Sequence, residues 1–155
     1  MNGRATMIVL DSNVFAKLLV SESDSALARQ LVRAIQSEAV PVVLPSLFVY
    51  ELVQVGRYHE LDTQSVLDFM DTQLLRNWLV VEPTRDDWKV GQEISSRGND
   101  RSGYPAMYDS IYHAIAIERQ GCFITADRKH FSKAKDFGSI VLLPQWQRAV
   151  AQYGN

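Results

Sequence analysis

The sequence predicts an α/β fold of three layers, in which helices cover both faces of a central parallel sheet. Five short apolar runs, rich in branched side chains and bounded by turn or charged residues, are typical of buried strands. Longer segments with the apolar spacing of helices lie between most of them, and strands that alternate with helices form parallel sheets covered on both faces. The predicted strands are Met7–Leu10, Pro41–Leu44, Leu79–Glu82, Cys122–Thr125 and Ile140–Leu142.

Each helix is predicted from its apolar spacing and from the residues at its ends. The first carries Leu27, Leu31 and Ile35 at intervals of four and begins at a good N-cap residue, Ser23 or Asp24. The last is apolar on nearly all sides, so we expect it to be central and buried. In chain order the predicted helices are Ser23–Ser37, Ser46–Tyr58, Thr63–Trp78, Thr84–Arg97 and Ala106–Ile117.

The length and composition predict one domain that spans residues 1–155. A chain of this size buries roughly two-thirds of its unfolded surface, which is enough for a core without disulfides. Its single cysteine fits a reducing compartment. The apolar run Met7–Leu10 is much shorter than a signal peptide or a membrane span requires. We therefore expect a cytoplasmic protein with no membrane partner.

Four acidic residues are expected to meet at one edge of the sheet, where ligands bind in open α/β folds. Asp11 directly follows the first predicted strand, and Asp127 follows the fourth by two residues. Helices that join parallel strands begin at this same edge, and Glu51 and Asp109 lie in early helical turns. Three of these acids also have a structural explanation when taken alone: Asp11 as a helix cap, Asp127 as a turn residue and Asp109 as a charge at a helix N-terminus. Glu51 is harder to explain in this way, because it points from an apolar face.

The surroundings of these acids predict a metal site. Leu47, Phe48 and Val55 lie one turn from Glu51, and no lysine or arginine lies one helical turn from Glu51 or Asp109. Two carboxylates about 4 Å apart repel each other by about 4 kcal/mol at an effective dielectric constant of about 20. A hard cation such as Mg²⁺ or Mn²⁺ prefers oxygen ligands and removes this repulsion. One cysteine and three scattered histidines do not have the spacing of a zinc site.

Four segments carry a resemblance to a known family, and the order and spacing of the chain agree with that family from Met7 to about Leu143. They are Ile8–Asn13, Pro45–Glu51, Tyr108–Ala116 and Phe123–Asp127. In this order the chain resembles PIN-domain ribonucleases and is similar to the VapC-type toxins of bacterial and archaeal toxin–antitoxin pairs. The resemblance implies a PIN-like fold with a five-stranded parallel sheet, a metal-dependent endoribonuclease activity, a homodimer and a cognate antitoxin protein.

The resemblance also assigns roles to residues of this chain. The residues that match the acidic quartet are Asp11, Glu51, Asp109 and Asp127. Of these, Asp11, Asp109 and Asp127 are expected to hold Mg²⁺ or Mn²⁺, and Glu51 to orient or deprotonate the attacking water. Asn13 and Thr125 match polar positions that order the site.

The basic residues are concentrated in the second part of the chain. Residues 1–96 have a net charge of −5 and residues 97–155 a net charge of +3. Arg128 and Lys129 directly follow the predicted site, so we expect them to contact phosphates of an RNA substrate. A solvated basic face is the alternative explanation.

Other functional classes fit the sequence less well. A phosphatase of the haloacid-dehalogenase type uses Asp-x-Asp after its first strand, and here Asn13 stands at the third position. A receiver-like signalling domain requires an acidic pair near that strand. A non-catalytic binding module has no need of Glu51 and Asp109 on apolar faces. Within the nuclease interpretation, a toxin and an RNA-processing nuclease without a toxin role remain alternatives.

Overall fold

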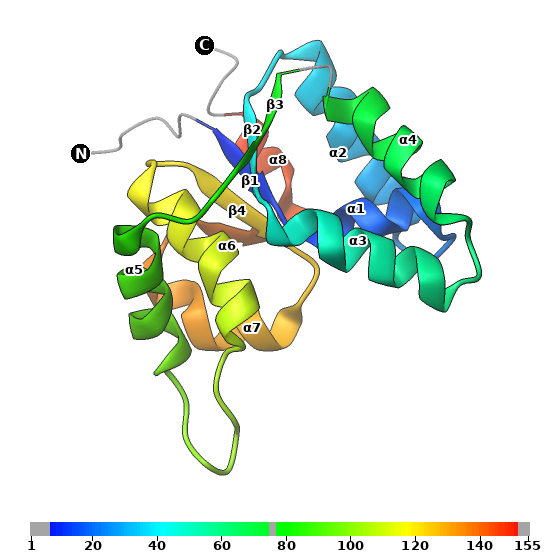
Figure 1. The fold of residues 1–155 in the computed structure, drawn as a ribbon. Helices are drawn as coiled ribbons and strands as arrows, with labels where there is room; N and C mark the ends of the chain where they lie inside the picture. The colour runs from blue at the N-terminus through cyan, green and yellow to red at the C-terminus, as the bar shows by residue number, and fades with distance from the viewer. Residues whose placement is uncertain (1–6, 75–76, 152–155) are drawn as a thin grey trace.

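A five-stranded sheet forms the centre of the molecule in the computed structural model, which describes residues 7–74 and 77–151 (Figure 1). The strand order is β3-β2-β1-β4-β5, and every neighbouring pair is parallel. The predicted α/β class with a parallel sheet is therefore confirmed. The strands are β1 (Ile8–Leu10), β2 (Val42–Pro45), β3 (Trp78–Val81), β4 (Cys122–Thr125) and β5 (Ile140–Leu142).

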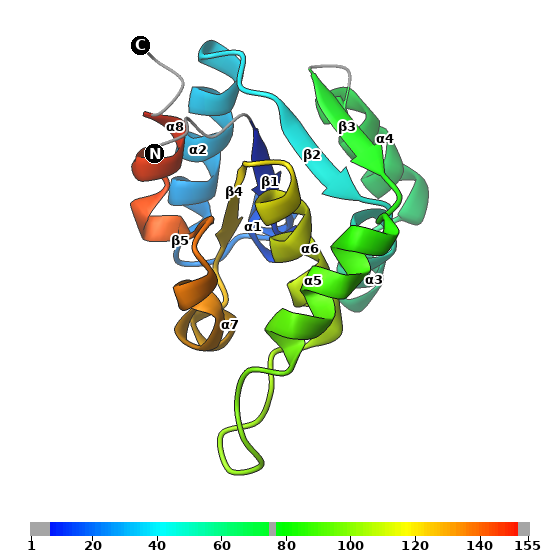
Figure 2. The ribbon, with the colours of Figure 1, turned by 90° about the vertical axis from the view of Figure 1, so that its left-hand side faces the viewer.

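Helices lie on both faces of this sheet. Figures 1 and 2 show α5 and α6 on one side and α1 and α2 on the other, and α6 packs against β1, β2 and β4. The α-helices are α1 (Ser12–Leu19), α2 (Ser25–Ser37), α3 (Leu47–Tyr58), α4 (Thr63–Leu74), α5 (Arg85–Ser95), α6 (Met107–Glu118), α7 (Arg128–Ala134) and α8 (Gln147–Val150). Two short 3₁₀ helices follow at Lys135–Phe137 and Leu143–Gln145.

The sheet is most deeply buried at its centre, where the predicted site residues Asp11 and Asp127 follow β1 and β4. All residues of β1, β2 and β4 are buried, whereas those of the edge strand β5 are only partly buried. Branched side chains fill these strands because both faces of the sheet are covered by helices.

Among the described residues, no helix is long and apolar enough to cross a membrane.

The structure corrects the sequence prediction at four helices. Helix α4 is described as far as Leu74, and Trp78, at which the predicted helix ends, instead begins β3 after Asn77, which adopts a left-handed backbone with a φ of 65°. Helices α1, α7 and α8 were not predicted. They have eight, seven and four residues, which are too few turns for apolar spacing to indicate a helix.

An ion pair joins the two helices that cover one face of the sheet. Asp87 on α5 is fully buried and accepts hydrogen bonds from Arg119, at the C-terminal end of α6, at 2.8 and 3.2 Å. Asp87 also completes a capping box with Thr84 at the start of α5. Burial alone would raise the pKa of Asp87, but the hydrogen bonds and charge of Arg119 and the bonds of Thr84 hold it below its ordinary value.

We expect Asp87→Ala to lower the free energy of unfolding by about 2–4 kcal/mol, because it removes a cap and leaves Arg119 without this buried partner. Chemical denaturation measures this, and Asp86→Ala, an exposed neighbour on the same turn, is the control and should change stability by less than about 0.5 kcal/mol. Equal effects of the two substitutions would contradict the role given to Asp87.

The stabilisation that this ion pair contributes depends on pH, and the pKa of Asp87 gives the direction of the dependence. The pKa of Asp87 is lower in the folded protein than its ordinary value of 3.8, so the stabilisation is complete above that value and is lost as the pH falls through the folded pKa. The difference in stability between the parent protein and Asp87→Ala should therefore shrink in strong acid.

Candidate active site

The carboxyl ends of β1 and β4 carry two of the predicted acids, and each of them caps a helix. Asp11 is the N-cap of α1, and its Oδ1 accepts a hydrogen bond from the backbone N–H of Asn13 at 3.3 Å. Asp127 is the N-cap of α7 and accepts from the backbone N–H groups of Lys129 and His130 at 2.8 and 3.0 Å. Each of these two acids therefore has a structural role in the fold, because it caps a helix.

The other two acids come from helix N-termini at the same edge. Asp109 lies in the first turn of α6, which runs antiparallel to the strand that follows it, and Glu51 lies in the second turn of α3, directly after β2. Both side chains are partly buried, whereas Asp11 is only 2% exposed. The fold thus brings all four acids to the edge where the sequence placed them.

Thr125 and Asn13 connect the ends of the two central strands. The Thr125 hydroxyl donates a hydrogen bond to Oδ2 of Asp11 at 2.6 Å and accepts one from the backbone N–H of Asp127 at 3.0 Å. The Asn13 side-chain oxygen accepts from the backbone N–H of Ala126 at 3.2 Å. Each polar side chain therefore links the segment after β1 to the segment at the end of β4.

The four carboxylates influence one another through their charges. Burial raises the pKa of Asp11 to about 7, the negative charges of Asp109 and Glu51 add to this rise, and the Thr125 hydrogen bond opposes it. Burial likewise raises the pKa of Asp109 to about 6, with contributions from the charges of Asp127 and Glu51. In the metal-free protein, ionisation of this site is opposed both by desolvation and by like charge.

Tyr112 is a site residue that the sequence did not reveal. Its hydroxyl is buried and donates a hydrogen bond to Oε1 of Glu51 at 2.7 Å, and the Ser12 side chain also hydrogen-bonds to Glu51. Burial nevertheless keeps the pKa of Glu51 above its ordinary value. Tyr112 was overlooked because it stands in an apolar helix and its ring stacks on Phe123, as a core residue would.

A cavity of about 180 Å³ lies beside Asp109 and Asp127. Lys129 lines it, as does Lys133 one turn later, whereas Arg128 is exposed on α7 and is not among the lining residues. The remaining lining residues are Tyr104, Pro105, Ala106 and His130. His130 lies between Lys129 and Lys133 in the sequence, but burial lowers its pKa to about 4, so this histidine is neutral near pH 7.

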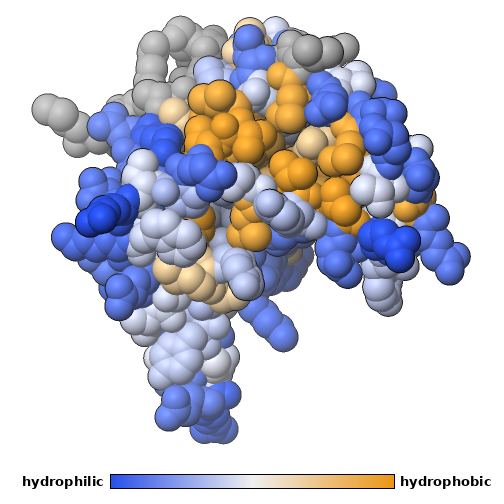
Figure 3. Space-filling view, in the orientation of Figure 1, coloured by the Kyte–Doolittle hydropathy of each residue, from blue (hydrophilic) through white to orange (hydrophobic). Residues whose placement is uncertain are grey.

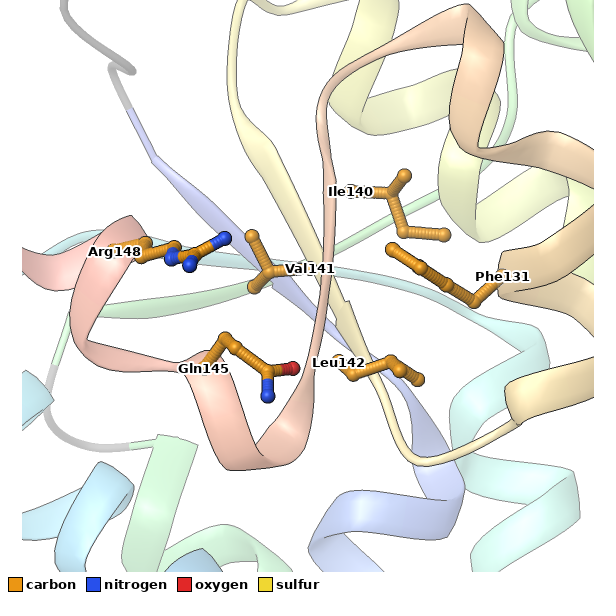
Figure 4. Close-up of a pocket in the computed structure, with 6 residues that line it drawn as sticks. All are labelled: Phe131, Ile140, Val141, Leu142, Gln145 and Arg148. Atoms are coloured by element: carbon orange, nitrogen blue, oxygen red, sulfur yellow. The ribbon is translucent and has the colours of Figure 1, made fainter.

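A larger cavity of about 310 Å³ lies elsewhere, beside the edge strand β5 (Figure 4). Its lining is mainly apolar and includes Phe131, three residues of β5 and the side chains of Gln145 and Arg148. None of the predicted site residues lines it. The smaller cavity is therefore the one associated with the acids.

The donor atoms at the acidic edge suit a hard divalent cation, because all four side chains offer carboxylate oxygen. As the side chains are placed, no three histidine, cysteine or acidic residues within residues 7–74 and 77–151 are grouped closely enough to hold a metal ion. The chemistry of the set fits Mg²⁺ or Mn²⁺, and a cation would neutralise the repulsion that raises the pKa values of Asp11 and Asp109.

Comparison with protein families supports the resemblance seen in the motifs. The family model described as PIN domain matches residues 8–136, which include all four acids and more than half of the chain. A comparison with curated proteins gives no match.

We expect Asp11→Asn to raise the free energy of unfolding of the metal-free protein at pH 8 by about 2–4 kcal/mol, since one pKa unit corresponds to about 1.4 kcal/mol. Asparagine can still accept the Thr125 hydrogen bond and is an equally good N-cap. Denaturation in EDTA measures this effect, with the exposed Asp71→Asn as the control. A variant less stable than the parent would mean that the ionised Asp11 stabilises the fold.

The pH dependence of stability at this site follows from the raised pKa of Asp11. Between the ordinary pKa of 3.8 and the folded pKa of about 7, folded Asp11 holds a proton that the unfolded chain has lost. Its contribution to stability should therefore increase as the pH falls from about 8 to about 4, and Asp11→Asn should remove this part of the increase.

Proposed function

The chain belongs to the PIN-domain family, a family of nucleases, and from this premise we propose that it is a metal-dependent endoribonuclease and the toxin of a toxin–antitoxin pair. Residues 1–155 form a single PIN-like domain in this proposal. The observation that carries it is the set of four mutually repelling carboxylates at the carboxyl edge of the sheet. The family membership favours this activity over the phosphatase alternative.

Each acid has a role in the proposed reaction. Asp11, Asp109 and Asp127 would hold Mg²⁺ or Mn²⁺, which when bound lowers the pKa of a water molecule and stabilises charge on the attacked phosphate. Glu51 orients the attacking water and accepts its proton. Its raised pKa makes it a stronger base than an ordinary glutamate, and the hydrogen bonds of Tyr112 and Ser12 fix its carboxylate.

The surroundings of the acids supply contacts for the RNA substrate. Lys129 lines the cavity beside Asp109 and Asp127, and Arg128 is exposed directly before it. Both cations are within a residue or two of Asp127, so they offset the negative charge that the four acids present to a phosphate. In the same proposal, the side-chain hydrogen bonds of Asn13 and Thr125 hold the ends of β1 and β4 together.

An antitoxin would block this site by placing a cation among the carboxylates. An arginine guanidinium is always charged and can bind a carboxylate with two hydrogen bonds, so it can replace the metal. Figure 3 shows apolar side chains gathered on the face that carries β3, α3 and α4, where Leu79 is 59% exposed. This face is the surface on which we propose that the antitoxin docks. The proposal also includes a homodimer of this chain.

The apolar stripe of α2 is not available as a docking surface for the antitoxin. The spacing of Leu27, Leu31 and Ile35 in the sequence fits either a docking face or ordinary core packing. The structure favours core packing, because Leu31 and Ile35 are 0% and 1% exposed and belong to the main core.

We expect the purified protein to cut RNA in the presence of Mg²⁺ or Mn²⁺ and to lose this activity in EDTA. Asp109→Asn should lower the rate by about a hundredfold or more, because it removes a proposed metal ligand, while the exposed Asp136→Asn should cut at the parental rate. Denaturing gels of a labelled RNA measure both effects. Undiminished cleavage in excess EDTA would overturn the proposed mechanism.

Expression of the chain alone should arrest growth, and expression of Asp109→Asn at the same level should not. Co-expression with the product of the adjacent small gene should restore growth, and the two proteins should purify together. If the parent protein cuts RNA but its expression is harmless and no neighbour binds it, the toxin role fails and the RNA-processing alternative is favoured.

A further inference from the structure

The loop between α5 and α6 is an ordered hairpin that extends beyond both helices (Figures 1 and 2). The Asn99 side-chain oxygen accepts hydrogen bonds from the backbone N–H groups of Arg101 and Ser102 at 3.0 and 2.9 Å, and Asn99 pairs with Gly103 across the turn. Gly98 has a φ of 132°, and a Cβ there would meet the Gly103 oxygen at 2.2 Å, so a side chain is not accommodated. The hairpin therefore has a defined shape of its own.

This hairpin is attached to the cavity beside the acids. Lys133 on α7 lines the cavity and donates a hydrogen bond from its ammonium group to the backbone oxygen of Ser102. Tyr104, at the end of the hairpin, lines the same cavity and is 52% exposed, with its hydroxyl donating to Asp100 at 3.2 Å. The hairpin thus places an accessible aromatic ring next to Asp109 and Asp127.

Two further exposed aromatic rings directly precede acids of the site in the sequence. Tyr108 is 66% exposed and immediately precedes Asp109, and Tyr50 is 75% exposed and immediately precedes Glu51. Rings left in water contribute little to the fold, since their apolar area is not buried. They are, however, the side chains on which unpaired bases stack, and such stacking tolerates any base because every base has a flat face.

We propose that Tyr104 stacks on one base of the RNA strand in this cavity and thereby selects the position at which the strand is cut. The inference rests on the proposed nuclease function and adds a specificity-determining residue to it. A cavity of about 180 Å³ is small for a ligand site and has room for one base, not for a paired duplex. Lys129, which lines the same cavity, binds a phosphate of the strand that carries this base.

Binding of short single-stranded RNAs, each with one abasic position, tests the proposal. The measurement is made in EDTA so that the strand is not cut, and cleavage positions are then mapped with Mg²⁺. For the parent protein, an abasic site at one position should weaken binding about five- to tenfold, which is the lower range for a single base–aromatic stack. In Tyr104→Leu, which keeps apolar bulk without a ring, this position should no longer matter, and the cleavage position should spread.

Two matched variants separate stacking from loop structure. Tyr104→Phe loses the bond to Asp100 but keeps the ring, so it should behave as the parent does. Tyr58→Ala removes a ring that is more exposed than that of Tyr104, 81% against 52%, from the far end of α3 and should leave binding and cleavage position unchanged. If the parent had no ring–base stack and Tyr104→Leu acted only by disturbing the hairpin, the variant would bind every RNA more weakly and the effect of the abasic position would persist.

The outcomes also separate this inference from the proposed function. If the parent protein binds and cuts RNA but the abasic effect is absent, or persists in Tyr104→Leu, the stacking role is overturned and the nuclease stands. If the parent protein neither binds nor cuts RNA, the proposed function falls and the stacking role falls with it.

Discussion

The pairing of β1 with β4 is the constraint on which the rest of the site depends. Parallel register sets Leu10 beside Ile124, and the backbone N–H of Asp11 continues the ladder by donating to the Ile124 oxygen at 3.0 Å. This brings the Thr125 hydroxyl within 2.6 Å of the Asp11 carboxylate and leaves Asp127 at the same edge. The central helix α6, which packs on both strands, then adds Asp109 and Tyr112. One pairing therefore determines which side chains can act together.

The fold holds this edge together at an electrostatic cost. Desolvation and like charge raise the pKa values of Asp11 and Asp109, and hydrogen bonds from Thr125 to Asp11 and from Tyr112 to Glu51 offset only part of this. Asp87 shows the contrasting arrangement in the same molecule, because it is equally buried but paired with Arg119, and its pKa is lowered. Asp87, a buried carboxylate in a structural role, has a cation beside it, whereas burial and then the charges of the neighbouring acids raise the pKa values of Asp11 and Asp109.

The sequence predicts the strands and the meeting place of the acids because both depend on local patterns. Short branched runs identify the strands, and the rule that ligands bind at the carboxyl edge places Asp11 and Asp127. The features that the sequence pattern does not predict depend on tertiary packing. Helix α7 is too short to show a period, Tyr112 has the spacing of a core residue, and His130 has the sequence of a basic cluster but a buried, neutral position. These features become visible only when α6, α7 and β4 are placed together.

The most direct test of the central claim is an NMR titration of the side-chain carboxyl carbons in the metal-free protein. Asp11 should titrate near pH 7 and Asp109 near pH 6, and addition of Mg²⁺ should move both titrations to lower pH, because a bound cation favours the ionised form. If both acids titrated near pH 4 without metal and did not respond to Mg²⁺, this would contradict the claim that the four carboxylates interact with one another and bind a cation.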